Sequence, residues 1–329
     1  MKVLFIGGTG VISSACSALC IQMGIDLYLL NRNQSFRQAP KGSKSIIADI
    51  RNVDEVKKVL KDQNFDAVID WIAYTPEHVI NDFDIFENKT SQFIFISSAS
   101  AYQKPPSAIP IKETERLFNP VWRYSQQKID CENILMDFFH TRNFPVTIVR
   151  PSHTYDKTLI PLYGRYTTLD RMINMKKIII HGDGTSLWTL THHKDFAEAF
   201  VRLIGVKEAI GEVYHITSDE ALSWNQICMA FAEALNVTPE IIHIPSDYIN
   251  KCDKEWGDGL LGDKSHSMIF DNSKIKSIYP EFKCKIPFKD GAKEIVDWYN
   301  DNPDKKIVIP EINVKMDKII SDYEAFFNK

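Results

Sequence analysis

The chain has 329 residues, and its 39 lysines and arginines stand against 43 aspartates and glutamates, a formal net charge of −4. This balance excludes a strong general attraction to nucleic acid or to anionic membranes, although it allows a local basic patch. A hydrophobic content of 44% is ordinary for a globular protein. No apolar stretch approaches the roughly 20 residues that cross a bilayer, so we expect no membrane partner.

Six cysteines lie scattered along the chain without a C-x-x-C pair. Their spacing argues against a disulfide framework and a zinc site, so we expect no metal and a cytoplasmic location. Cys16 and Cys20 are four residues apart and are predicted to share a buried helix face.

The first half of the chain alternates apolar runs with helical stretches. In chain order, strands are predicted at 2–8, 26–32, 45–49, 67–73, 92–98 and 146–151, with helices that include 11–23, 53–63 and 120–140. The strand runs are almost continuously apolar rather than alternating, which is typical of strands buried on both faces. Residues 1–155 are therefore predicted to form an α/β dinucleotide-binding domain, a Rossmann-type doubly wound parallel sheet.

The second half is less regular. Strands are predicted at 177–184, 211–217 and 241–245, and helices at 193–205, 223–235, 289–299 and 314–327, with Ser223 as an N-cap. We expect a smaller C-terminal α/β substrate lobe at 156–302, from which a segment near 190–215 returns to the first domain. Residues 303–329 are predicted to form a C-terminal extension with an amphipathic helix.

The stretch GGTGVISS at 7–14 lies between the first predicted strand and helix. Gly7 and Gly10 would let the backbone turn tightly and approach a pyrophosphate at the helix N-terminus. Ser13 stands where a third glycine would complete the pattern, and we expect it to loosen the packing slightly without blocking a phosphate. By spacing alone, an ordinary strand–helix turn remains an alternative.

Two further strand ends bear on the choice of cofactor. The second strand ends in Asn31 and Arg32 without a carboxylate, which favours NADP slightly over NAD, unless this is only a solvated strand end. Asp49 ends the third strand, where it could meet the adenine amino group or cap the next helix.

YSQQK at 124–128 lies in the long predicted helix. Tyr124 and Lys128 are four residues apart and so share one face. The lysine ammonium is expected to stabilise the phenolate and lower the tyrosine pKa, which would make Tyr124 a usable acid/base.

Six segments in this order resemble one family. They are GGTGVIS, ADI at 48–50, IFISSASAY, YSQQK, VRPSHTY and HGDGTSLWTLTHHKD. Together they resemble an extended short-chain dehydrogenase/reductase of the NAD-dependent epimerase/dehydratase kind, to about residue 300. The chain departs from that pattern at Ser13, at Asp156, which replaces a glycine, and at Trp188, which replaces an arginine that meets the substrate diphosphate.

The resemblance implies the roles of individual residues. Tyr124 would be the acid/base, Lys128 would hold the nicotinamide ribose, and Ser98, rather than Ser97, would bind the substrate oxygen. The implied contacts of NAD(P) are Gly7, Thr9, Gly10, Val11, Ile12, Asn31, Arg32, Asp49, Ile50, Ile72, Ala73, Tyr124, Lys128, Pro151, Ser152 and His153. His192 and Asp195 match a segment that packs the lobes and caps a helix.

The implied reaction is hydride transfer at a hydroxyl of a sugar or nucleotide-sugar substrate, by an epimerase or a reductase. Ala99 and Ser100 stand where 4,6-dehydratases of the family carry an acidic pair, which disfavours dehydration. Trp188 could stack on a substrate ring or simply pack. A homodimer through two long helices is expected from the family.

Two other functions stay open. Chloroplast stem-loop-binding proteins resemble the same superfamily but bind RNA, and a non-catalytic dinucleotide sensor would keep only the cofactor pocket. The net negative charge and the retained Tyr124 and Lys128 argue against RNA binding.

Overall fold

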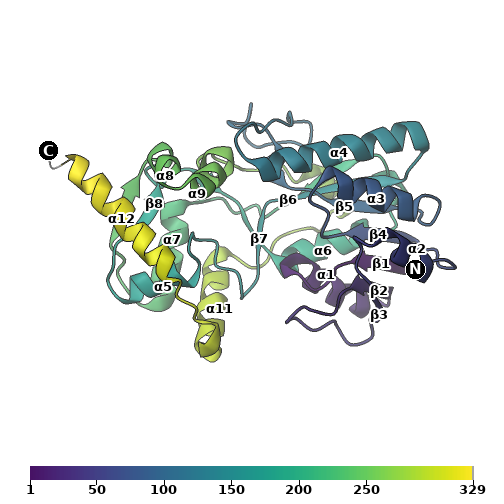
Figure 1. The fold of residues 1–329 in the computed structure, drawn as a ribbon, viewed down its shortest axis with the longest axis horizontal. Coiled ribbons are helices and arrows are strands. Elements are labelled where there is room, and N and C mark those ends of the chain that lie inside the picture. The colour runs from purple at the N-terminus through teal and green to yellow at the C-terminus, as the bar shows by residue number, and fades with distance from the viewer. Residues whose placement is uncertain (328–329) are drawn as a thin grey trace.

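Seven parallel strands form the central sheet of the computed structural model, which describes residues 1–327 and side chains to residue 325 (Figure 1). Their order across the sheet is β11-β6-β5-β4-β1-β2-β3. The strands are β1 (Lys2–Ile6), β2 (Asp26–Asn31), β3 (Lys44–Ile47), β4 (Ala67–Asp70), β5 (Phe93–Ile96), β6 (Val146–Pro151) and β11 (Val213–Ile216). The predicted parallel, Rossmann-type sheet is confirmed.

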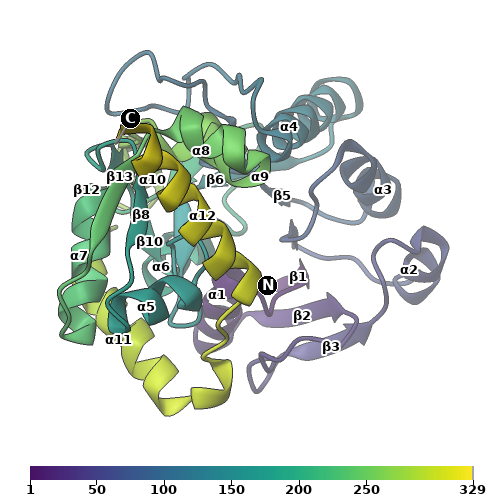
Figure 2. The same cartoon turned by 60° about the vertical axis from the view of Figure 1, so that its left-hand side comes forward.

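Helices cover both faces of this sheet (Figures 1 and 2). One face packs against α1 (Val11–Gln22) and α6 (His193–Leu203). The other packs against α2 (Val53–Val59), α3 (Pro76–Phe86) and α4 (Arg123–Arg142). The sheet is thus buried on both sides, which explains why its strands are almost continuously apolar.

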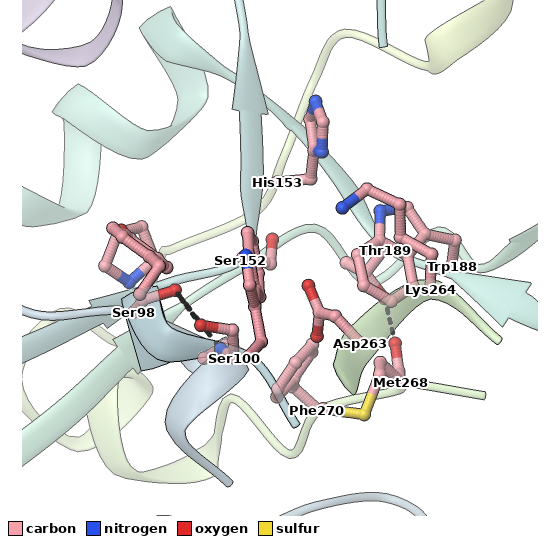
Figure 3. Close-up of a pocket in the computed structure, with 14 residues that line it drawn as sticks. Ser98, Ser100, Ser152, His153, Trp188, Thr189, Asp263, Lys264, Met268 and Phe270 are labelled. Atoms are coloured by element: carbon pink, nitrogen blue, oxygen red, sulfur yellow. Dashed lines mark hydrogen bonds between the residues drawn. The ribbon is translucent and has the colours of Figure 1, made fainter. Parts of the chain in front are cut away.

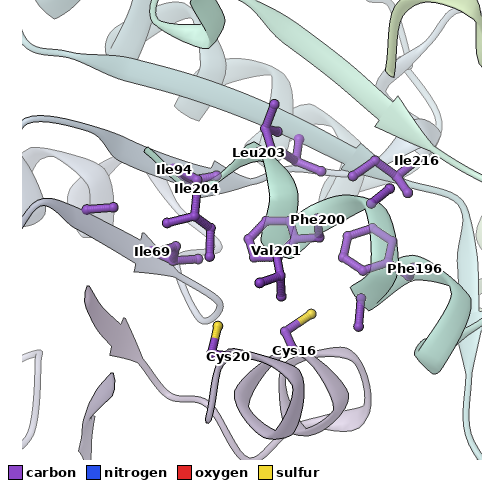
Figure 4. Packing of buried hydrophobic residues seen from close by; sticks show 14 of the residues in the cluster. Cys16, Cys20, Ile69, Ile94, Phe196, Phe200, Val201, Leu203, Ile204 and Ile216 are labelled. Carbon is purple, nitrogen blue, oxygen red and sulfur yellow. The ribbon is translucent and has the colours of Figure 1, made fainter. Parts of the chain in front are cut away.

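Cys16 and Cys20 lie on the buried face of α1, as the sequence predicts, against Phe200 and Val201 of α6 (Figure 4). Both cysteines are fully buried, and burial raises the pKa of the Cys20 thiol to about 12. A thiol that stays protonated in an apolar core acts as a small hydrophobic side chain.

The chain leaves the larger domain after β6 and returns to it later. The short strand β7 (His153–Tyr155) pairs with β10 (Leu190–His192), directly before α6. After α6, strand β11 pairs in parallel with β6 and completes the sheet. Residues 190–216 therefore pack with the larger domain, although they follow a stretch of the smaller lobe.

The smaller lobe contains short sheets surrounded by helices (Figure 2). Its strand pairs are β8 (Ile178–His181) with β13 (Ile241–Ile244), and β9 (Leu187–Trp188) with β12 (Leu222–Ser223). Its helices are α5 (Tyr166–Ile173), α7 (Trp224–Leu235), α8 (Ser246–Cys252), α9 (Lys254–Gly259), a π-helical turn (Leu260–Lys264), α11 (Phe288–Asp301) and α12 (Pro310–Phe327). Helix α10 (Ser273–Ile278) instead packs against α6 and β11 of the larger domain. Ser223 caps α7 as predicted, since its hydroxyl accepts a hydrogen bond from the Gln226 amide.

Two helix starts differ from the prediction. Helix α4 begins at Arg123 rather than near residue 120, because Asn119 Oδ1 accepts hydrogen bonds from the Val121 and Trp122 amides and forms a turn there. Helix α12 begins at Pro310 rather than 314, since a proline is well tolerated in a first helical turn. In addition, α2 ends at Val59, four residues short of the predicted end.

Helix α12 packs on the smaller lobe rather than standing apart from it (Figure 2). Met316, Ile319 and Ile320 are buried against a cluster that includes Ile244 and Trp256. None of the helices in residues 1–327 combines the length and apolar character that a membrane crossing needs.

Candidate active site

The glycine loop between β1 and α1 owes its shape to Gly7 and Gly8. These residues have φ angles of +100° and +97°, whereas Gly10 has an ordinary φ of −77° and is the N-cap of α1. A Cβ at position 8 would lie 2.6 Å from Leu29 Cδ2. The prediction that Gly7 and Gly10 make the turn is therefore wrong in part. Gly8 supplies the second left-handed conformation, which only glycine adopts at low cost.

Ser13 is integrated into the start of α1. It is buried, and its Oγ accepts a hydrogen bond of 2.8 Å from the Gly10 amide. The hydroxyl thus satisfies one of the backbone donors that a helix N-terminus leaves without an intrahelical partner. The amides of Val11 and Ile12 follow at the same helix end, where the sequence predicts contacts with a pyrophosphate.

A cavity of about 690 Å³, here called the Gly-loop cavity, lies at the carboxyl ends of β1, β2 and β3. Ligands of open α/β sheets bind at this edge. Of the predicted cofactor contacts, the cavity is lined by Gly7, Thr9, Asn31, Arg32, Asp49, Ile50 and Ile72. Gly10, Val11, Ile12 and Ala73 are not among its lining residues.

The roles of Asp49 and Arg32 are clearer in the structure. Asp49 does not cap α2, because Asn52 Oδ1 accepts the hydrogen bond from the Glu55 amide. Asp49 and Arg32 instead face each other across 3.8 Å, with Arg32 about two-thirds exposed. An ion pair this long and exposed is weak, so both side chains stay available to a ligand.

Arg37 connects the loop after β2 to the segment after β7, a contact that the sequence did not suggest. Its Nη2 lies 3.0 Å from Asp156 Oδ2 and also donates to Thr158 Oγ1. Asp156 is buried, and it is the residue that replaces a glycine of the family pattern. The two residues are 119 positions apart, so no local pattern could have paired them.

Lys128 and Tyr124 lie on α4 below the ends of β4 and β5. Lys128 is buried, and its Nζ donates hydrogen bonds of 2.7 Å to the carbonyls of Ala73 and Ile96. Burial lowers the pKa of Lys128 to about 8. Its Nζ lies 5.9 Å from the centre of the Tyr124 ring.

The expected lowering of the Tyr124 pKa by Lys128 is wrong for this structure. Burial raises the pKa of Tyr124 to about 12, and a hydrogen bond with Ser98 only partly offsets that rise. The ammonium of Lys128 is engaged by two backbone carbonyls, so it does not reach the phenol oxygen.

A second cavity, here called the inner cavity, has a volume of about 280 Å³, and Tyr124 is one of its lining residues. Figure 3 shows this cavity with Ser98 and Lys264 among the labelled residues. It is lined by Ser98, Ala99, Ser100, Trp122, Tyr124, Pro151, Ser152, His153, Trp188, Thr189, Asp263, Lys264, Met268 and Phe270. It thus brings together Ser98, Tyr124 and the predicted contacts at 151–153. Ser98 Oγ is 2.9 Å from Ser100 Oγ, and Ser100 accepts a hydrogen bond from Ser125.

Ser97 points elsewhere. It is buried, and its hydroxyl donates to Glu132, which also pairs with Arg150 behind the sheet end. The structure therefore distinguishes two adjacent serines that the sequence could only rank.

Several residues that line the inner cavity were not predicted from the sequence. Trp122 precedes α4, and Asp263, Lys264, Met268 and Phe270 come from the segment that follows α9. Asp263 forms an ion pair of 3.4 Å with Lys104. This segment is about 140 residues from Tyr124 in the chain and carries no spacing pattern typical of a site, so only the tertiary structure could find it.

His192, His193 and Asp195 connect the two parts of the molecule. His192 accepts a hydrogen bond from the Lys194 amide at the start of α6, and its Nε2 lies 2.9 Å from Glu294. The Asp195 carboxylate accepts hydrogen bonds from the backbone amides of residues 285 and 286. His193 Nδ1 lies 3.0 Å from the Val11 carbonyl, next to the glycine loop. These contacts fit the predicted role in packing and capping.

A buried pair of carboxyl groups supports the turn that holds Lys128. Asp70 Oδ1 accepts hydrogen bonds from the backbone amides of Ile72 and Ala73. Both Asp70 and Asp82 are fully buried. As two carboxylates, Asp70 Oδ2 and both Asp82 oxygens would lack a donor. A proton on Asp82 supplies one, and burial followed by the nearby Asp70 raises the pKa of Asp82 well above its ordinary value.

Asp82→Asn is expected to stabilise the protein at high pH. The folded pKa of Asp82 is raised, so its contribution to stability is fully present below the unfolded pKa of about 3.9 and is lost as the pH rises through the folded value. The variant lacks this loss. Its advantage in the free energy of unfolding should grow by up to about 1.4 kcal/mol per pH unit above pH 5 until the folded carboxyl ionises. Urea unfolding at several pH values measures the difference, and a constant gap would contradict a protonated Asp82.

The sheet topology, the glycine turn and the two cavities at the strand ends define a Rossmann-type α/β protein. The chain matches the NAD dependent epimerase/dehydratase family over residues 3–217, about two-thirds of its length, and belongs to that family.

Proteins of several activities are similar to this chain in sequence or in fold. The chain is 23% identical to dTDP-D-glucose 4,6-dehydratase of Mus musculus, over 92% of this chain and 89% of that one. It is 26% identical to the chloroplast stem-loop binding protein of 41 kDa b of Arabidopsis thaliana, over 74% and 65%. A UDP-glucose 4-epimerase from Bifidobacterium longum, in complex with NAD+ and UDP, has the same fold, with a TM-score of 0.71, 19% identity and coverage of 93% and 100%.

Proposed function

We propose that this protein is an NAD(P)-dependent epimerase or reductase that acts on a hydroxyl of a sugar or nucleotide-sugar substrate. The observation that carries the proposal is the inner cavity, in which Tyr124 and Ser98 meet, next to Lys128 and the carboxyl ends of β5 and β6. A tyrosine and a serine within reach of one substrate oxygen are suited to moving its proton.

The residues around the Gly-loop cavity fit a dinucleotide. Gly7 and Gly8 leave the backbone free of Cβ atoms where a pyrophosphate would approach, and Asp49, Ile50 and Ile72 would enclose an adenosine. Pro151, Ser152 and His153 line the inner cavity together with Tyr124. A bound NAD(P) would supply the hydride acceptor for oxidation of the substrate alcohol.

The chain's own residues would handle the proton. Tyr124 would take the proton from the substrate hydroxyl, and Ser98 would hold the same oxygen by a hydrogen bond. Lys128 is held by hydrogen bonds to two carbonyls, from where it would bind the ribose hydroxyls of the cofactor. The pKa of Tyr124, about 12 in the structure, must fall when the site is filled for this step to run near neutral pH.

Dehydration is disfavoured by the residues next to Ser98. Ala99 and Ser100 line the inner cavity and carry no acid. The carboxylate that does line it, Asp263, is paired with Lys104 and so is poorly placed to act as a free base. The similarity to dehydratases therefore reflects membership of the same family, and we do not infer a dehydration step from it.

Mass spectrometry of nucleotide released from the purified protein, with titrations of NAD and NADP, tests the proposal. Retained NAD would support an epimerase that regenerates its cofactor, and reversible NADP binding would support a reductase. Arg32→Ser is expected to weaken NADP about tenfold more than NAD, because one charge-assisted hydrogen bond to a phosphate is lost. Equal weakening would contradict a preference for NADP, and a protein that binds neither dinucleotide would contradict the proposal.

The similarity to a chloroplast stem-loop binding protein favours RNA binding as a second candidate. Titration of the protein with a labelled stem-loop RNA at physiological salt distinguishes RNA binding from the proposed dinucleotide-dependent activity. Tight RNA binding without dinucleotide binding would favour the second candidate.

A further inference from the structure

Three residues join the inner cavity to a larger one in the smaller lobe. This outer cavity has a volume of about 640 Å³, and Trp122, His153 and Lys264 line both cavities. They form a neck between the space beside Tyr124 and the space within the lobe. A substrate with two parts would place the junction of those parts at this neck.

Lys264 is held firmly in place by its backbone. Its carbonyl accepts hydrogen bonds from His181 Nε2 at 3.0 Å, from Ser186 Oγ at 3.1 Å and from Trp224 Nε1 at 3.1 Å. It also ends the π-helical turn Leu260–Lys264, a conformation that often marks functional sites. Three side-chain donors on one carbonyl fix the point from which the Lys264 side chain extends.

The ammonium of Lys264 lacks a strong partner. No carboxylate in residues 1–325 lies within ion-pair distance of it, and the adjacent Asp263 pairs with Lys104 instead. Its acceptor is the Gly259 carbonyl, at the long distance of 3.5 Å. The Nζ lies 5.1 Å from the ring centre of Trp122 and 5.8 Å from that of Trp188. A partly buried cation with so little compensation favours an anionic ligand.

Trp188 adds a second donor without an acceptor. It is 4% exposed, it lines the inner cavity, and its Nε1 has no hydrogen-bond partner among the described residues. Figure 3 shows Trp188 and Lys264 together on the side of the cavity opposite Ser98 and Ser100. Buried indole N–H groups usually find an acceptor, and this one has almost no accessible surface, so a ligand oxygen would reach it only after a shift of the Trp188 ring.

We propose that Lys264, at the neck between the two cavities, binds an anionic phosphoryl or carboxyl group of the substrate, with the indole N–H of Trp188 beside it in the inner cavity. This inference rests on the proposed function and names the substrate class of that site. Position 188 lacks the arginine that the family resemblance predicts for the substrate diphosphate. Lys264 restores a positive charge from a different segment, and the residue at 188 contributes a neutral donor.

Binding of anionic probes to Lys264→Met and Lys264→Arg variants tests the assignment. The probes are UDP, inorganic pyrophosphate and glucuronate, titrated at constant ionic strength and followed by calorimetry and by the fluorescence of the adjacent tryptophans. Lys264→Met is expected to weaken the bound probe by about 10–100-fold, since a hydrogen bond to a charged group is lost. Lys264→Arg should restore most of the affinity, and Trp188→Phe should weaken it less than Lys264→Met does.

Lys315→Met is the matched control. Lys315 lines the outer cavity, but its ammonium is already neutralised by Asp253, so probe affinity should change little. Dinucleotide affinity and the melting temperature of each variant report whether the fold is intact. Loss of UDP and pyrophosphate alone would identify a phosphoryl group, whereas loss of glucuronate alone would identify a carboxyl group.

Two results would overturn the inference: a wild-type protein that binds none of the probes, or a Lys264→Met variant that binds them as the wild type does. Tyr124→Phe separates this inference from the proposed function, because it should leave probe affinity intact. If hydride transfer is never observed but Lys264→Met still loses its probe, the inference stands and the proposed function falls. If turnover depends on Tyr124 and probe binding ignores Lys264, the reverse holds.

Discussion

Tyr124→Phe is expected to reduce turnover by about 10²–10⁴-fold, the usual contribution of a positioned general acid or base. The phenol is the group in the inner cavity that would accept the substrate proton, and phenylalanine keeps the ring that packs 5.0 Å from Trp122. The variant should therefore fold normally and bind its dinucleotide with no more than a few-fold change in affinity. Formation of reduced nicotinamide with a panel of nucleotide sugars, followed by absorbance, measures the effect.

Ser98→Ala is the comparison for this experiment. Ser98 would hold the substrate oxygen without taking its proton, so its loss should cost less than the loss of the phenol. Unchanged turnover in Tyr124→Phe would refute the assigned acid/base. A loss of turnover that comes with an equal loss of dinucleotide affinity would mean that Tyr124 mainly binds the cofactor.

Glu132→Ala is expected to be the most destabilising of the substitutions considered, at about 3–5 kcal/mol in the free energy of unfolding. Arg150 Nε lies 2.9 Å from Glu132 Oε1, its Nη2 lies 2.5 Å from Oε2, and both side chains are at least 95% buried. Removal of the carboxylate leaves the guanidinium in the interior without its counter-charge. Urea unfolding followed by circular dichroism measures the loss.

Two variants control for this effect. Glu87→Ala breaks an exposed ion pair with Arg142, which lies on α4 as Glu132 does. This substitution should lower the free energy of unfolding by at most about 1 kcal/mol. The double substitution Glu132→Leu with Arg150→Met removes both charges, and should recover much of the lost stability. If Glu132→Ala costs no more than Glu87→Ala, the buried pair does not carry the stability assigned to it.

Local sequence patterns predicted the larger domain well, because its elements depend on their own residues. The near-continuous apolar runs identify strands buried on both faces, and the four-residue spacing of Tyr124 and Lys128 places them on one face of α4 whatever surrounds the helix. The Ser223 cap was equally readable, since capping depends on residues three positions apart. The family match over residues 3–217 agrees with the resemblance drawn from the ordered motifs.

The conformation of each glycine in the glycine loop could not be predicted from the sequence. Which glycine takes a positive φ depends on what the loop packs against, and at Gly8 that neighbour is Leu29 of the adjacent strand. The pKa of Tyr124 was misjudged for a similar reason. Spacing places Lys128 on the same helix face, but the carbonyls of Ala73 and Ile96 decide where its ammonium points.

By itself, the sequence determined the class of fold, the family and the positions of Tyr124, Lys128 and Ser98, because these follow from periodicity and from motifs within short segments. Only the tertiary structure decided what faces them. Lys264 reaches the cavity from the smaller lobe, beside Trp188, whose position the family resemblance already associates with the substrate. Arg37 meets Asp156 across 119 positions. Contacts between distant segments leave no spacing pattern in the chain. The chemistry of the substrate pocket therefore became visible only when packing brought these segments together.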